Sequence, residues 1–170
     1  MALVYVSLGS NVDRYRHIHS ALDALSAAFG DLVISKVYES ESIGFEGSHF
    51  LNLAVAFNCE LTVAQLLKCL RGIEDLNGRL RGGPKFSSRT LDIDILTCDD
   101  LVGIVDGVKL PRDEIVNNAF VLLPMVDIAP EGAHPVLKKT YRQLWQDYDQ
   151  ASQKLWPVNF DWNQQRISTA

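Results

Sequence analysis

Cysteine is scarce in this sequence, and long apolar runs are missing. The three cysteines, Cys59, Cys69 and Cys98, are odd in number and have no C-x-x-C spacing, so they favour neither a disulfide framework nor a zinc site. The longest apolar runs, residues 53–57 and 119–126, are far too short to span a bilayer. No charged-then-apolar signal segment opens the chain. We therefore expect a cytoplasmic protein that does not associate with a membrane.

An excess of positive charge is also absent. The formal net charge is −5, which argues against a general nucleic-acid-binding surface, so any basic cluster must be local. The hydrophobic share of 47% and the charged share of 22% are ordinary for a folded protein and argue against disorder. A chain of 170 residues can bury its own core. We expect a single domain over residues 1–170 and a monomer.

Hydrophobic periodicity and capping signals predict the element order β-α-β-β-α-β. The predicted strands are residues 2–8, 32–39, 50–61 and 89–96, and the predicted helices are 13–30 and 62–77. This order is that of an α+β, ferredoxin-like domain, an antiparallel sheet with helices packed on it. Asp106-Gly107 predicts a hairpin turn, and Thr140 a helix to about residue 155. We expect His17 and His19, early in the first helix, to be solvated.

The strand at 89–96 carries two aspartates at period two. Leu91, Ile93 and Ile95 would point to one face of the sheet and Asp92 and Asp94 to the other. Same-face neighbours lie about 6.6 Å apart, and carboxylates that close repel unless a cation or a proton lies between them. The pattern indicates a Mg²⁺ site. A surface strand with two solvated aspartates is the alternative.

A basic, glycine-rich segment lies directly before this strand. Arg79, Arg81 and Arg89 can bind phosphate groups in a bidentate way, and Gly82-Gly83-Pro84 would let the segment move over a substrate. Arginines next to paired carboxylates indicate phosphoryl-type transfer, with one or two metal ions at the aspartates.

The same residues carry a family resemblance. Gly78-Arg79-Leu80-Arg81, followed by Ser88-Arg89-Thr90-Leu91-Asp92-Ile93-Asp94-Ile95, resembles the signature of 6-hydroxymethyl-7,8-dihydropterin pyrophosphokinase, a folate-pathway enzyme. Further segments are similar to that family along most of the first 130 residues: 5–11, 38–44, 50–55, 73–74 and 120–124. An ordered set of this kind is far more specific than a lone D-x-D.

The resemblance implies transfer of a pyrophosphoryl group from ATP to the hydroxymethyl group of the pterin, with AMP as the other product. Asp92 and Asp94 would bind two Mg²⁺ ions, and Arg79 and Arg89 would stabilise the charge that develops during transfer. Catalysis would then depend mainly on positioning and electrostatics.

The resemblance also implies a pterin site. Phe50 and Phe120 would sandwich the flat ring, and Asn52 would hydrogen-bond its polar edge. Backbone groups of Ser40 and Ile43 would assist. The chemistry is consistent, since stacking needs two aromatic faces and an amide both donates and accepts. Ordinary core aromatics are the alternative for the two phenylalanines.

On the ATP side the resemblance points to Glu74, Arg81 and Arg112. We expect Glu74 to orient an arginine, with a solvated helix-end carboxylate as the alternative. Arg112 stands where the family commonly has a histidine, and Asn118 lies near a family arginine; those family residues contact ATP phosphates. Arg112 can supply positive charge, whereas Asn118 cannot.

Two other functions compete with catalysis. A degenerate paralogue would bind a pterin or nucleotide without efficient turnover, which the changes at Arg112 and Asn118 favour and the retained aspartates and arginines oppose. An RNA-binding module would use the exposed face of a ferredoxin-like sheet. The acidic net charge and the lack of an aromatic-basic RNA motif argue against it.

Overall fold

The computed structural model describes residues 1–41, 49–78 and 90–170. Its strands are β1 (Ala2–Ser10), β2 (Val33–Ile34), β3 (Tyr38–Ser40), β4 (Phe50–Cys59), β5 (Asp92–Cys98), β6 (Gly103–Val105), β7 (Val108–Leu110), β8 (Leu155–Pro157), β9 (Phe160–Trp162) and β10 (Gln165–Ser168). Its helices are α1 (Arg14–Phe29), α2 (Val63–Leu76), α3 (Glu114–Asn117), α4 (Ala119–Ile128) and α5 (Tyr141–Asp147).

The main sheet is antiparallel and has six strands. The paired strands follow the order β5-β1-β4-β3-β8, and β2 pairs with β4 beside β3. With α1 and α2 as the two intervening helices, the elements from β1 to β5 follow the predicted ferredoxin-like order, with the second strand divided into β2 and β3. The expected antiparallel sheet with helices packed on it is confirmed. β6 and β7 form a separate hairpin, as do β9 and β10.

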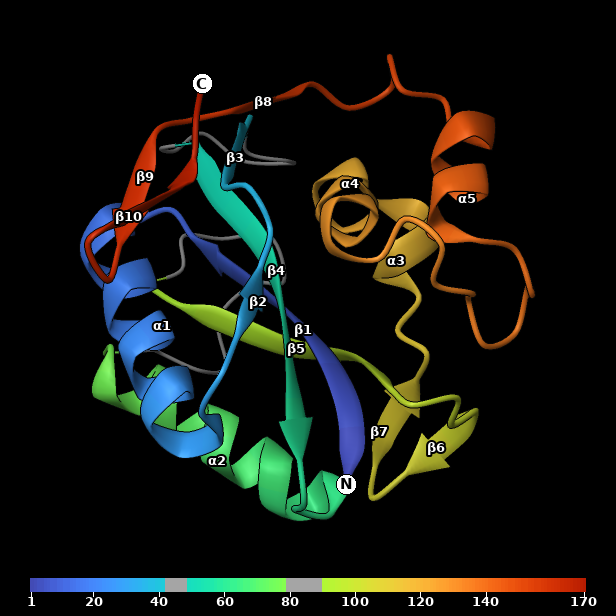
Figure 1. Cartoon of the computed structure of the whole chain (residues 1–170), viewed down its shortest axis with the longest axis horizontal. Helices are drawn as coiled ribbons and strands as arrows, with labels where there is room; N and C mark the ends of the chain where they lie inside the picture. Colours follow the sequence, from blue (N-terminus) through green and yellow to red (C-terminus); the bar gives the residue numbers. More distant parts are fainter. Residues whose placement is uncertain (42–48, 79–89) are drawn as a thin grey trace.

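Helices lie on both faces of the sheet (Figure 1). On one face, α1 and α2 bury a core made of alternate residues of β1, β4 and β5, such as Leu8, Leu53 and Ile93. On the other face, α4 packs over β4, and α3 and α5 pack against α4. Because α4 covers only part of that second face, side chains elsewhere on it can reach a ligand.

Local signals explain several element boundaries. Thr62 and Gln65 form a reciprocal capping box at the start of α2, and Thr140 does the same with Gln143 at α5. Asp106 and Gly107 both have positive φ, 50° and 81°, which is the backbone geometry of the predicted two-residue hairpin turn.

The strand predicted at 32–39 is interrupted, and this part of the prediction is wrong. β2 ends at Ile34, and Ser35 bonds Ala54 through both its backbone N–H and its side-chain oxygen. Val37 then turns away from β4: its N–H donates to Ser168 Oγ, and its carbonyl accepts from the N–H of Val158. The break exists because the C-terminal segment binds to this part of the chain.

Two further expectations are corrected. The C-terminal helix ends at Asp147 and not near 155, because Leu155–Pro157 forms β8 and covers the edge of β3. His17 is not solvated: it is only 4% exposed, and its Nδ1 lies 2.8 Å from Asn77 Oδ1 at the end of α2. This contact joins α1 to the C-terminal end of α2.

The hairpin β9–β10 packs on α1, although the two are far apart in the sequence. Phe160 is 2% exposed, and its ring stacks between Tyr15 at 5.3 Å and His19 at 4.8 Å between ring centroids. Trp162 Nε1 donates to Asp23 Oδ1, also on α1. The C-terminal segment is therefore part of the packed structure.

We expect Phe160→Ala to lower the free energy of unfolding by about 3 kcal/mol, since truncation of a buried Phe leaves a cavity between two rings. Urea unfolding followed by circular dichroism measures it. Ile104→Ala is the control, because Ile104 is 78% exposed and should change stability by less than about 0.5 kcal/mol. Equal effects of the two substitutions would contradict the packing role of Phe160.

Candidate active site

Asp92 and Asp94 lie on the face of β5 that turns away from α1 and α2. The apolar residues that alternate with them lie in the core under α2 and are at most 2% exposed: Leu91, Ile93 and Ile95. Both aspartates are partly exposed. The alternation predicted from the sequence is therefore present, and the two carboxylates share one face.

The strand register extends this face into a row of site residues. Gly9 of β1 pairs with Asp92 on one side and with Asn52 of β4 on the other, and Asn52 pairs with Tyr38 of β3. Directly paired residues of antiparallel strands point to the same face. We call Asp92, Gly9, Asn52 and Tyr38 the site row. Asp92 and Asn52 are two strand spacings apart, roughly 10 Å.

Glu74 fixes the aspartate strand from the opposite face. It is 0% exposed; its Oε2 accepts from the backbone N–H of Ile93 at 2.8 Å, and its Oε1 accepts from Arg71 at 2.9 Å. Because β5 ends the strand order in the ranges that the structure describes, this carboxylate takes the place of a further strand at Ile93. We expected Glu74 to orient an arginine, and in the structure it binds Arg71. The alternative of a solvated carboxylate is wrong, because Glu74 is buried.

Asp94 lies in an environment with too much negative charge. Burial and the neighbouring Asp92 raise its pKa to about 7, although Arg112 opposes the shift. An Arg112 guanidinium nitrogen lies 3.4 Å from Asp94 Oδ1, and Arg112 Nε lies 3.1 Å from Glu114 in an ion pair without hydrogen-bond alignment. Among the described residues, three carboxylates raise the pKa of Asp94 and one cation lowers it, so Asp94 has there a deficit of positive charge that a cation can fill.

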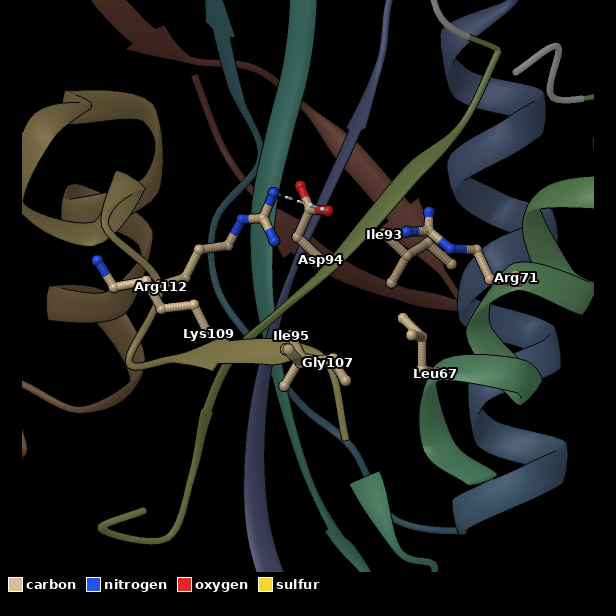
Figure 2. Close-up of a pocket in the computed structure, with 9 residues that line it drawn as sticks. Leu67, Arg71, Ile93, Asp94, Ile95, Gly107, Lys109 and Arg112 are labelled. Carbon is tan, nitrogen blue, oxygen red and sulfur yellow. Dashed lines mark ion pairs between the residues drawn. The ribbon is translucent and has the colours of Figure 1, made fainter. Parts of the chain in front are cut away.

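A cavity of about 150 Å³ adjoins Asp94. Its basic residues come from different elements: Arg71 approaches from α2, and Lys109 and Arg112 belong to β7 and the loop after it. Figure 2 shows Arg112 reaching toward Asp94 from one side of β5 and Arg71 lying on the other side. The apolar and backbone lining is Leu67, Ile93, Ile95, Gly107 and Val108.

Sequence reasoning missed Arg71 and Lys109. Arg71 precedes Glu74 by three residues on α2, so the two lie on one helix face, and that spacing was the available signal. Lys109 alternates with two buried residues of a short strand, Val108 and Leu110, and nothing local distinguished it from a surface lysine.

The expected acceptor residues lie at the other end of the site row. Asn52 is 8% exposed, and its Oδ1 has no hydrogen-bond partner among the residues that the structure describes. Phe50 and Ser40 pair with each other one step along the same face. A buried amide oxygen of this kind is completed by a ligand that donates a hydrogen bond.

Phe120 is in the first turn of α4, the helix that packs over β4. Tyr38 of the site row ties that helix to the sheet, since its hydroxyl donates to Asp127 of α4 at 2.8 Å. Burial raises the pKa of Tyr38 well above its ordinary value, so the hydroxyl stays a donor. Stacking of a ring between Phe50 and Phe120 stays a prediction.

Arg79, Arg81, Arg89 and Ile43 lie outside the described residues. Within the ranges that are described, no three or more His, Cys, Asp or Glu side chains gather as a metal-binding group. Two carboxylates alone suit Mg²⁺, which keeps positions for water and substrate oxygens. In those same ranges, no helix combines the length and apolar character needed to cross a membrane.

Comparison with known proteins agrees with this site. The sequence model of the 7,8-dihydro-6-hydroxymethylpterin-pyrophosphokinase family matches residues 5–130, which include the whole site row. The chain belongs to this family. The family is one of ATP-dependent pyrophosphokinases of folate biosynthesis, and this chain is one of these enzymes.

Two bacterial relatives carry the name 2-amino-4-hydroxy-6-hydroxymethyldihydropteridine pyrophosphokinase. The one from Porphyromonas gingivalis is 38% identical over 141 residues, covering 79% of this chain and 95% of the relative. The one from Aquifex aeolicus is 34% identical over 146 residues, covering 85% of this chain and 91% of the relative. The pyrophosphokinase is therefore similar to both along nearly their whole length.

The fold also matches solved structures of Plasmodium falciparum HPPK-DHPS. One such structure, a triple mutant with STZ-DHP, matches with a TM-score of 0.70 at 18% identity, covering 86% of this chain and 43% of that one. The pyrophosphokinase spans less than half of those longer chains. At this identity the match supports the fold alone.

The raised pKa of Asp94 leads to a stability prediction. Because the folded protein holds this pKa above the ordinary value of 3.8, keeping Asp94 charged costs stability progressively from about pH 4 to about 7, and fully above that. Without metal, Asp94→Asn should therefore stabilise the enzyme at pH 8 by about 1–3 kcal/mol and much less near pH 4. Thermal unfolding in a chelator at both pH values measures the difference. A less stable Asn variant at pH 8 would contradict the charge deficit.

Proposed function

We propose that the second face of the sheet transfers a pyrophosphoryl group from ATP to the hydroxymethyl oxygen of 6-hydroxymethyl-7,8-dihydropterin, releasing AMP. One observation carries this proposal. At one end of the site row, two carboxylates adjoin a cavity whose lining includes three basic side chains. Along the same row lies Asn52, whose side-chain oxygen has no hydrogen-bond partner among the described residues. The phosphate donor, ATP, would bind at the carboxylate end of the row, and the flat pterin acceptor would bind near Asn52.

Asp92 and Asp94 are the residues that would hold Mg²⁺. Their donor atoms are hard oxygens, and the raised pKa of Asp94 reflects charge that a divalent ion would neutralise. When bound, Mg²⁺ would shield the phosphate charge as the new bond forms. Glu74 keeps the two carboxylates in place through Ile93, which lies between them.

Arg112, Arg71 and Lys109 would bind the ATP side. The cavity that they line opens beside Asp94, so a nucleotide there would have its phosphates directed to the carboxylates. Arg79, Arg81 and Arg89 are proposed, from the family resemblance, to add charge to the same phosphates, with Arg79 and Arg89 acting on the group in transfer. Fixed cations of this kind lower the barrier through electrostatic stabilisation.

Asn52 would orient the acceptor. Its oxygen, which has no partner in the described part of the chain, would accept from an N–H on the polar edge of the pterin. Phe50 and Phe120 would stack on the ring, and Ser40 and Ile43 would offer backbone groups. The span from Asn52 to Asp92 is on the scale of a bicyclic ring with a short arm, so the hydroxymethyl group would reach the carboxylates. Catalysis then follows from holding the attacking oxygen near the phosphorus.

The enzyme should release AMP from ATP and Mg²⁺ only when 6-hydroxymethyl-7,8-dihydropterin is present. Asp94→Ala should abolish this release because it removes a proposed metal ligand, and Asp100→Ala, an exposed aspartate at the turn after β5, should leave it unchanged. Chromatography of nucleotide and pterin products measures both. Pterin binding by the unaltered protein without AMP release would instead support a binding protein that does not turn over.

Arg112 allows a separate test of the donor side. We expect Arg112→Ala to raise the KM for ATP about tenfold or more, since a charge-assisted hydrogen bond contributes about 1.5–3 kcal/mol, while the KM for the pterin stays within about twofold. Arg112→His, the common family residue, should keep most of the ATP affinity. Arg142→Ala is the control, because Arg142 pairs with Glu131 away from the site. An unchanged KM for ATP in Arg112→Ala would remove Arg112 from the donor site.

A further inference from the structure

Gly9 lies at the centre of the site row, and its backbone conformation does not require a glycine. Its φ is not positive, so its backbone is one that any residue adopts. A glycine inside a strand weakens it, and such a glycine often marks a place where another group approaches the backbone closely. The cause must therefore be sought in the space above Gly9.

That space is filled by Asn52. A Cβ built on Gly9 would lie 2.8 Å from Asn52 Nδ2 and 3.9 Å from Phe50 Cδ1. Non-bonded carbon contacts optimise at about 3.5–4.0 Å, so the first distance is a clash and the second an ordinary contact. The carboxamide of Asn52 leans over Gly9 into the volume where any other residue would carry its side chain.

The position of that carboxamide decides what its oxygen can do. Asn52 is 8% exposed, and in the described part of the chain nothing bonds to its Oδ1. Gly9 also lies between Asn52 and Asp92 in the register, so nothing from β1 rises between the amide and the carboxylate. Between the Asn52 carboxamide and Asp92, β1 therefore presents only backbone, against which a flat ring can lie.

We propose that Gly9 is a positioning residue for the acceptor: it lets Asn52 lean over β1 and present its oxygen, and it provides a flat floor for a planar heterocycle with a hydrogen-bonding edge. This inference rests on the proposed function, because it assigns the acceptor to the site row. It concerns acceptor recognition alone, since the cations that line the cavity, Arg71, Lys109 and Arg112, belong to other elements.

The test is a double-mutant cycle of Gly9→Ala and Asn52→Ala, with binding of 6-hydroxymethyl-7,8-dihydropterin measured by calorimetry and the KM values measured for both substrates. Each single variant should weaken pterin binding about tenfold, the effect of one lost hydrogen bond, with the KM for ATP within about twofold. The double variant should bind the pterin as Asn52→Ala does, because the group that the new methyl displaces is then gone.

Thermal unfolding adds a readout that does not depend on activity. Gly9→Ala should lower the melting temperature, and Asn52→Ala in the same chain should restore it to that of Asn52→Ala alone. Gly72→Ala is the matched control: Gly72 is exposed on α2 with nothing within 4 Å of its added Cβ, so pterin binding should not change.

Three outcomes would overturn the role of Gly9: pterin binding by Gly9→Ala equal to that of the unaltered enzyme, losses that add in the double variant, or equal losses for ATP and pterin. Failure of the unaltered enzyme to bind the pterin would defeat the proposed function instead. In that case the melting temperatures of the single and double variants still show whether a side chain at position 9 would clash with Asn52.

Discussion

The buried carboxylate of Glu74 is the interaction on which the arrangement of the site depends. A charged group inside a protein is costly unless it is paired and hydrogen-bonded, and Glu74 is both, through Arg71 and the backbone of Ile93. The bond to Ile93 joins α2 to the last paired strand of the sheet. It holds the one residue that separates Asp92 from Asp94, so the position of the two carboxylates depends on a contact with α2. The same carboxylate turns Arg71 toward the cavity.

The cost of this design is electrostatic. Burial raises the pKa of Asp94 most, and Asp92, Glu74 and Glu114 raise it further, while Arg112 lowers it as the one opposing cation in the described part of the chain. A site built for stability would have balanced these charges. Such unbalanced charge is typical of functional sites.

Much of this could be predicted from sequence because the signals are local. Period two in Asp92-Ile93-Asp94 fixes which side chains share a face, and the Thr62–Gln65 pair fixes the start of α2. The errors concern contacts between segments distant in the chain. The pairing of Leu155–Pro157 with β3 and the turn of Val37 toward Ser168 depend on where the C-terminus packs, which no local pattern encodes. His17 was misjudged for the same reason, since its partner Asn77 lies on another helix.

The structure shows what surrounds Asn118, one of the two positions that depart from the family pattern, which sequence alone did not show. Asn118, near a family arginine, accepts a hydrogen bond from Gln153, whose own side-chain oxygen accepts from the N–H of Ala119 at the start of α4. Gln153 belongs to the C-terminal segment, beyond the region that matches the family, so position 118 here serves the junction between that segment and α4. Within the described ranges, positive charge beside Asp94 comes from Arg112, while Arg71 and Lys109 line the adjoining cavity in ion pairs with Glu74 and Asp113. A donor site can keep its charge while one residue that supplied it is given over to packing, provided that neighbouring elements carry cations to the same cavity.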